Sequence, residues 1–170
     1  MKVLAIDPGT THSAFVQYDE LWVPSAALKG KIPNEELLSK LRSWRSCKDV
    51  QEHIVVIEMI ASYGMAVGRE VFETCVWIGR FMEAWGPGAQ RLFRRDVKLN
   101  LCHTGKARDA NIRQALIDRF GPPGTKAAPG GTYGYKADIW AALAVAVTYA
   151  DKMRAESQAI KEEVTRAKSK

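Results

Sequence analysis

The first eighteen residues follow an apolar and polar pattern that predicts two strands joined by a turn. Residues 1–6 (M-K-V-L-A-I) are apolar nearly throughout, as in a buried strand, and residues 12–18 (H-S-A-F-V-Q-Y) alternate. Pro8 and Gly9 between them are typical turn residues. The pattern predicts a β-hairpin with Asp7 at the end of its first strand. Three roles are open for this carboxylate, namely a turn cap, a phosphate-loop element or a metal ligand.

Further apolar runs predict three more strands. Residues 54–57 (I-V-V-I) form a continuous run typical of a strand buried on both faces, and Glu58 follows directly. Weaker signals predict strands at 21–24 and 90–93. Helical patterns occupy residues 33–44, 66–84, 107–120 and the segment from 136 onward. This order predicts an α/β fold with one five-stranded mixed β-sheet flanked by α-helices.

Apolar stripes within the predicted helices identify expected core positions. The first helix has its stripe at Leu37, Leu38, Leu41 and Trp44. The second has its stripe at Val67, Val71, Cys75, Ile78 and Met82, with Trp77, Phe81 and Trp85 also expected to pack. The last helix is rich in alanine, and small residues let a helix pack close against a sheet.

The length and composition indicate one globular domain. The chain has 170 residues and is 46% hydrophobic, which is enough for a substantial core. We expect a single domain over residues 1–155 and a charged C-terminal tail over 156–170 that frays or lies on the surface. Residues 121–135 are dense in glycine and proline and predict a loop.

The charge and the cysteine content indicate what kind of partner the protein binds and in which cellular compartment it works. The formal net charge of +6 favours an anionic partner, of which nucleic acid is the commonest, although a basic charge also occurs in merely soluble proteins. The three cysteines are far apart in sequence, which argues against zinc, a redox pair or a disulfide framework and favours a reducing cytoplasm. The chain shows no signal peptide and no apolar run of the ~20 residues that a membrane span needs.

Three carboxylates stand at the ends of predicted elements. Asp7 and Glu58 end two apolar strands, and Asp138 begins the last helix. If the two strands are parallel neighbours, their ends lie about 5 Å apart. Like charges held together need a cation, and Mg²⁺ or Mn²⁺ prefers such oxygen ligands. The alternatives are a turn cap for Asp7 and a helix-dipole interaction for Asp138.

A cluster of basic residues predicts a phosphate-binding surface. Lys and Arg contacts to phosphate supply affinity that does not depend on sequence. The alternative is a solvated charged face. The predicted contacts are Arg94, Arg95, Lys98, Lys106, Arg108 and Arg113, with Lys29 and Lys31 as additions.

The chain resembles the RuvC-like Holliday junction resolvases of the RNase H-like superfamily, in particular their small bacteriophage relatives. The resemblance covers most of residues 1–150 and rests on four segments in order. These are I-D-P-G-T at 6–10, V-I-E at 56–58, V-K at 97–98 with G-K-A at 105–107, and K-A-D-I-W-A-A-L-A-V-A at 136–146.

The resemblance implies a homodimeric, metal-dependent endonuclease that resolves four-way DNA junctions in the cytoplasm of a bacterial host. Asp7, Glu58 and Asp138 match the metal-binding acids, which implies Mg²⁺ or Mn²⁺ with two ions per site. Lys98 matches a family lysine near the scissile phosphate. Nuclease action on other branched DNA, such as flaps and forks, is an alternative, and so is a non-catalytic DNA-binding module.

The sequence departs from the family pattern at three positions. Ala141 stands where family members carry a further aspartate, and Asp109 stands where they carry a basic residue. Ala61 stands where an aromatic residue wedges into the junction, so Tyr63 or Met65 is the expected substitute. The opening turn also resembles the phosphate loop of the actin and sugar-kinase superfamily. That fold needs more than about 300 residues, so no nucleotide cofactor is expected.

Overall fold

The computed structural model describes residues 1–21, 24–47, 52–62, 64 and 66–168. Its five strands are β1 (Lys2–Asp7), β2 (His12–Asp19), β3 (Lys29–Pro33), β4 (Ile54–Met59) and β5 (Gln90–Phe93). They form one sheet in the order β3-β2-β1-β4-β5. β1 pairs antiparallel with β2 and parallel with β4, so the predicted hairpin and mixed sheet are confirmed.

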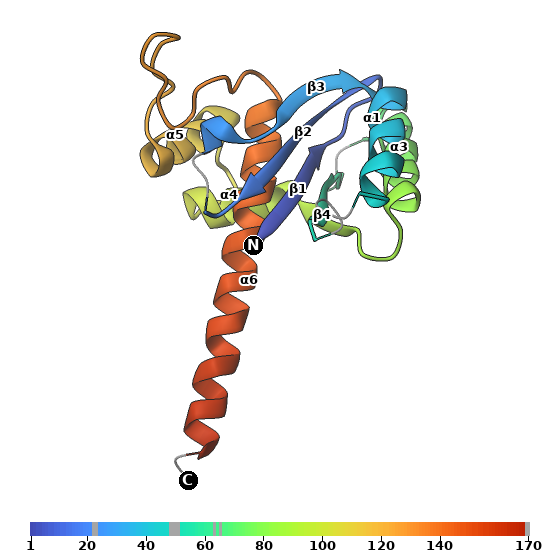
Figure 1. The fold of residues 1–170 in the computed structure, drawn as a ribbon. Helices are drawn as coiled ribbons and strands as arrows, with labels where there is room; N and C mark the ends of the chain where they lie inside the picture. The colour runs from blue at the N-terminus through green and yellow to red at the C-terminus, as the bar shows by residue number, and fades with distance from the viewer. Residues whose placement is uncertain (22–23, 48–51, 63, 65, 169–170) are drawn as a thin grey trace.

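Helices cover both faces of this sheet (Figure 1). The helices α1 (Asn34–Arg45) and α3 (Arg69–Trp85) lie together on one face. The other face carries α4 (Arg94–Cys102), α5 (Asp109–Phe120) and the long α6 (Ile139–Lys168). Among the described residues, no helix is both long and apolar enough to cross a membrane.

The alternation of side chains along β1 separates two cores. Leu4 and Ile6 pack with the buried leucines of α1, whereas Val3 and Ala5 pack against α6. Fully buried alanines of α6, including Ala142 and Ala144, bring this helix close to β1 and β2, as the small-residue pattern predicts. The same alternation directs the next residue of β1, Asp7, to the α6 face.

The third strand does not lie where the sequence predicts it. Residues 22–23 of the predicted 21–24 strand lie outside the described residues, Leu21 is in a turn, and Pro24 begins the short 3-10 helix η1 (Pro24–Ala26). β3 comes later and pairs with β2, with Ala14 opposite Lys31. Its sequence, K-G-K-I-P, has too few apolar residues to show an alternating pattern.

The helical predictions differ from the structure in two respects. Of the stripe predicted for α3, Ile78 is buried, whereas Val67, Val71, Cys75 and Met82 are not. Phe81 and Trp85, which were also expected to pack, are buried, and the sequence pattern missed Thr74 and Ala84. α4 was not predicted, because it is short and highly charged. It begins where the Asp96 carboxylate accepts a hydrogen bond from the Phe93 N–H at 3.3 Å.

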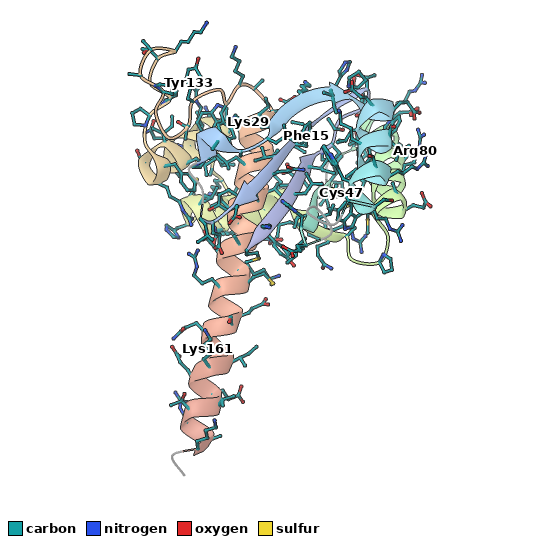
Figure 2. All side chains as sticks on the ribbon, in the orientation of Figure 1. Phe15, Lys29, Cys47, Arg80, Tyr133 and Lys161 are labelled. Atoms are coloured by element: carbon teal, nitrogen blue, oxygen red, sulfur yellow. The ribbon has the colours of Figure 1, made fainter. Side chains whose placement is uncertain are left out.

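The predicted C-terminal tail is part of α6. The helix continues to Lys168, and its residues from 155 onward are exposed. This half projects away from the rest of the molecule, as the position of Lys161 in Figure 2 shows. Two residues attach the helix just before this half. Asp151 accepts hydrogen bonds from Arg119 at 2.7 and 2.8 Å and from Asn100 at 3.0 Å, and Arg154 forms an ion pair with Glu20.

Candidate active site

Asp7 and Glu58 are neighbours on two adjacent parallel strands. Ile6 of β1 is in register with Ile57 of β4, so the residues that follow each of them lie side by side. Both carboxylates point to the α6 face, because each follows an isoleucine that belongs to the opposite core. Glu58 lies within β4 rather than after it, and it is buried. The prediction that these two strand ends meet is confirmed.

A buried hydrogen-bond network holds the turn behind Asp7. Asn34, the first residue of α1, donates through Nδ2 to the Gly9 carbonyl oxygen at 2.9 Å. Its Oδ1 accepts a hydrogen bond from the Ser13 hydroxyl at 2.7 Å. The Gly9 N–H donates in turn to Ser13 Oγ at 3.2 Å. A Cβ on Gly9 would lie 2.5 Å from the His12 carbonyl oxygen, so the turn requires glycine.

Asn34 was not identified from the sequence. Its contacts reach 21 and 25 residues back along the chain, and no local pattern reports such pairings. The available signal was a polar residue directly after Pro33 at a predicted helix start, which reads equally well as ordinary helix capping.

Asp138 lies in the turn that leads into α6. The preceding residue, Ala137, has a left-handed backbone with φ of 40°, an unfavourable conformation for a residue with a Cβ. The Asp138 carboxylate accepts a hydrogen bond from Lys31 Nζ of β3 at 2.5 Å. Lys31, predicted as an additional phosphate contact, is therefore the ion-pair partner of a site acid.

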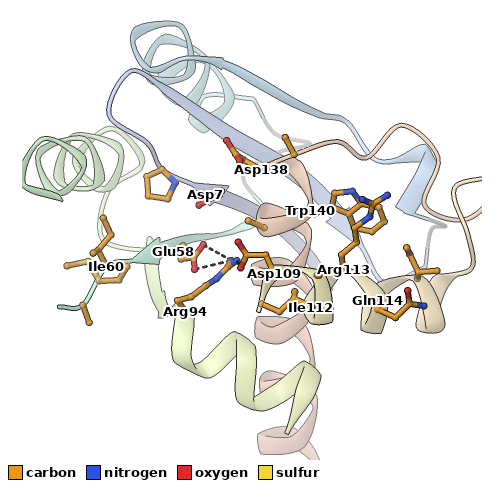
Figure 3. Close-up of a pocket in the computed structure, with 17 residues that line it drawn as sticks. Asp7, Glu58, Ile60, Arg94, Asp109, Ile112, Arg113, Gln114, Asp138 and Trp140 are labelled. Atoms are coloured by element: carbon orange, nitrogen blue, oxygen red, sulfur yellow. Dashed lines mark hydrogen bonds and ion pairs between the residues drawn. The ribbon is translucent and has the colours of Figure 1, made fainter. Parts of the chain in front are cut away.

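Arg94, the first residue of α4, contacts the carboxylates of both Glu58 and Asp109. Its Nη1 lies 3.3 and 3.4 Å from the two carboxylate oxygens of Glu58. Its Nη2 lies 2.5 Å from Oδ1 of Asp109, the first residue of α5. Figure 3 shows the guanidinium between these carboxylates. Arg94 thus pairs with site acids, whereas the sequence predicted a contact to DNA.

Burial and mutual repulsion raise the pKa values of Asp7 and Glu58. Desolvation, the negative charge of Glu58 and a hydrogen bond to Glu58 raise the pKa of Asp7 to about 8. Desolvation also raises the pKa of Glu58, against the opposing effect of Arg94. Burial disfavours the charged guanidinium of Arg94, but the carboxylates outweigh it and raise the pKa of Arg94.

These residues line an open cleft of about 1030 Å³. The cleft holds the carboxylates of Asp7, Glu58, Asp109 and Asp138 and is also lined by Arg94, Arg113 and Trp140 (Figure 3). Ala141 lies on its wall, so the position without the expected family aspartate does face the site. An open cleft with acids on several elements is suited to an extended ligand with a divalent cation.

The donor chemistry fits a divalent cation, although the acids are not gathered around one point. Carboxylate oxygens are the ligands that Mg²⁺ and Mn²⁺ prefer. Burial and the neighbouring charge of Glu58 raise the pKa of Asp7, and a bound cation would oppose both effects. In the part of the chain that the structure describes, no group of three or more His, Cys, Asp or Glu side chains is arranged to hold a metal ion. Glu58 is instead ion-paired with Arg94, and Asp138 with Lys31.

Comparison with solved structures identifies the fold. The chain is similar to a Thermus thermophilus RuvC structure, with 18% identity and a TM-score of 0.61 over 92% of this chain and 97% of that one. It is also similar to T. thermophilus RuvC in complex with Holliday junction substrate, with 18% identity and a TM-score of 0.63 over 92% and 96%. The chain has the RNase H-like fold of RuvC. No protein-family model and no curated protein sequence matches it.

On this RuvC-like fold the predicted basic residues lie on α4, on α5 and in the connection between them. Arg113 of α5 lines the cleft, with its guanidinium 5.2 Å from the centre of the Trp140 ring. Lys98 lies one helical turn beyond Arg94 on α4. The side chains of Arg95, Lys106 and Arg108 are exposed. Tyr63 and Met65, the predicted wedges, lie outside the described residues.

Proposed function

We propose that the protein is a metal-dependent, structure-selective DNA endonuclease that resolves four-way (Holliday) junctions by paired phosphodiester hydrolysis. The observation that carries the proposal is the adjacent pair Asp7 and Glu58, which opens into the cleft. The similarity in fold to RuvC, one structure of which holds Holliday junction substrate, supports the choice of DNA.

The cofactor in this proposal is Mg²⁺ or Mn²⁺, with two ions per site. Asp7, Glu58 and Asp138 are the residues that would hold them. When bound, such ions supply an activated water and stabilise the leaving oxygen of a phosphodiester. The network of Asn34, Ser13 and Gly9 keeps Asp7 oriented toward the cleft.

Basic residues around the cleft supply the proposed DNA contacts. We assign to Arg113 and Lys98 the phosphates nearest the acids, with Lys98 beside the scissile phosphate. Arg95 on α4 extends the proposed contact, as do Lys106 and Arg108 in the connection to α5, while Arg94 acts within the cleft. Tyr63 is the proposed wedge at the junction centre.

Paired cleavage implies a homodimer, and α3 offers a surface for it. Phe72 and Val76 are one helical turn apart and are 61% and 60% exposed. Apolar side chains of this size, exposed together on one helix, are typical of a protein interface. We assign this face of α3 to contact with a second copy, which would place two clefts on one junction. From the sequence resemblance we further propose that the protein is of the bacteriophage type and acts in the cytoplasm of a bacterial host.

The proposal is tested with a labelled four-way junction, a 5′ flap, a replication fork and linear duplex, each in Mg²⁺, Mn²⁺ or EDTA. We expect cleavage of the junction alone, and only with a metal. Equal cleavage of flaps or forks would replace the junction with branched DNA in general. Junction binding without cleavage in either metal would make the protein a non-catalytic DNA-binding module.

A further inference from the structure

Arg94 connects a buried acid of the cleft with an exposed one. The Glu58 side chain is 9% exposed and the Asp109 side chain 83%, and the guanidinium between them is 26% exposed. Two different nitrogens of Arg94 donate hydrogen bonds to these acids, Nη1 to Glu58 and Nη2 to Asp109. The arginine therefore holds both carboxylates at the same time.

The contact with Glu58 uses the atoms that a divalent cation would need. Nη1 lies 3.3 Å from one carboxylate oxygen and 3.4 Å from the other. A buried ionised carboxylate without a positive partner is strongly destabilised, so ionised Glu58 requires either Arg94 or another cation. Because both oxygens face the guanidinium, the two partners exclude one another.

The second partner of Arg94, Asp109, lies on a helix and not on the sheet that carries Glu58. Asp109 is the first residue of α5 and is solvated, so its negative charge is tolerated without a metal. At 2.5 Å its oxygen is nearer to the guanidinium than either oxygen of Glu58. A guanidinium that leaves Glu58 thus keeps an ion pair at the rim of the cleft.

We propose that Arg94 is an internal counter-ion that competes with the divalent cation for Glu58, and that Asp109 retains Arg94 in the cleft when the cation takes Glu58. The inference rests on the proposed function, because it requires a cation at Glu58. Asp109 replaces the basic residue of the resembled family, and its pairing with Arg94 gives this departure a role. Arg94 and Asp109 are positioning residues in this scheme.

Mn²⁺ binding to the full chain, measured by electron paramagnetic resonance at one fixed pH, tests the competition. Arg94→Gln removes the competitor and is expected to tighten Mn²⁺ binding about tenfold. Asp109→Asn leaves Glu58 as the remaining acidic partner of Arg94 and is expected to weaken binding several-fold. The double variant is expected to match Arg94→Gln, because Asp109 acts only through Arg94. Arg80→Gln, which removes an arginine paired with Glu35 on the other face of the sheet, is the matched control.

Thermal unfolding provides a readout without metal. In EDTA, Arg94→Gln is expected to unfold at a lower temperature than the wild type, since Glu58 loses its partner. Saturating Mn²⁺ is expected to raise the unfolding temperature of Arg94→Gln more than that of the wild type. Arg80→Gln is expected to respond to Mn²⁺ as the wild type does.

The outcomes separate this inference from the proposed function. Equal Mn²⁺ affinity in the wild type and Arg94→Gln would overturn the competition while leaving a metal-dependent nuclease intact. A loss of affinity from Asp109→Asn that persists in the Arg94→Gln background would make Asp109 a ligand and overturn its retaining role. Failure of the wild type and every variant to bind Mn²⁺ would overturn both proposals.

Discussion

Asn34 Nδ2 donates a hydrogen bond of 2.9 Å to the carbonyl oxygen of Gly9, which ties the start of α1 to the turn behind Asp7. Asn34 and Ser13 are both about 1% exposed, so the network is shielded from water. Hydrogen bonds of this kind are costly to break on one side, because the remaining partner stays buried.

Asn34→Ala is therefore expected to lower the free energy of unfolding by about 1–3 kcal/mol. The substitution removes the hydrogen-bond donor to the Gly9 carbonyl oxygen and the acceptor for the Ser13 hydroxyl. Urea denaturation measures the change, with Gln114→Ala as the control. Gln114 bonds only an exposed neighbour, so we expect about 0.5 kcal/mol or less for it. Equal effects from the two substitutions would mean that the network does not hold the turn.

The raised pKa of Asp7 predicts a pH-dependent stability. The folded protein keeps a proton on Asp7 up to about pH 8, whereas the unfolded chain releases it near the ordinary value of 3.8. The folded state therefore binds more protons between these values, and the free energy of unfolding must fall as pH rises through this window. In EDTA we expect a loss of about 1–2 kcal/mol between about pH 6 and pH 8.

Asp7→Asn tests the assignment of this slope. The amide resembles the protonated carboxyl but does not titrate, so the variant is expected to lose most of the pH dependence and to be the more stable protein at high pH. Denaturant unfolding across the pH series measures both slopes. Parallel curves for the wild type and Asp7→Asn would contradict the assignment to Asp7.

Arg113→Ala is expected to weaken junction binding and to reduce its salt dependence. Removal of one phosphate contact lowers the slope of log affinity against log salt by about 1. Fluorescence anisotropy in EDTA, over a salt series, gives both quantities. Arg80→Ala, on the opposite face of the sheet, is expected to keep the wild-type slope. An unchanged slope for Arg113→Ala would place this residue outside the DNA contact.

The proposed dimer face makes a prediction about mass in solution. Phe72→Glu with Val76→Glu places two charges on the exposed apolar face of α3, and we expect it to convert a dimer to a monomer. Light scattering after size exclusion measures the mass. Leu21→Glu, at a residue 87% exposed, is expected to remain dimeric. A wild-type monomer, or a dimer unaffected by the α3 charges, would contradict the assignment.

The proposed domain boundary is tested by removal of residues 156–170. The described residues from 155 to 168 are exposed, so their loss removes little buried surface. We expect the free energy of unfolding to change by about 0.5 kcal/mol or less. A much larger loss would show that the domain extends into the projecting half of α6.

The sequence predicted those parts of the fold that local patterns encode. β1, β2 and β4 have clear apolar or alternating patterns, and β5 was found from a weaker one. The site could be predicted because Asp7 and Glu58 each directly follow an isoleucine of a buried strand. β3 was misplaced because its pairing with β2, rather than its own residues, makes it a strand. The buried Thr74 of α3 was missed because a polar residue gives no apolar signal in the sequence, whereas the buried Phe81 was expected to pack.

The ion pairs of the site could not have been predicted from local patterns. Lys31 and Asp138 are separated by 107 residues, and Arg94 and Glu58 by 36. A basic residue near a predicted DNA surface looks the same in sequence whether it contacts phosphate or a carboxylate. Only the folded arrangement shows that Arg94 and Lys31 balance charge within the cleft.

Junction resolution is tested by mapping the cleavage products of a four-way junction that is labelled on each strand in turn. With Mg²⁺ we expect paired nicks at symmetric positions in two opposite strands. We expect no nicks with EDTA or with Asp7→Asn, although the variant still binds the junction. Cleavage by Asp7→Asn at the wild-type rate, or the absence of any cleavage by the wild type in Mg²⁺ and Mn²⁺, would contradict the proposed function.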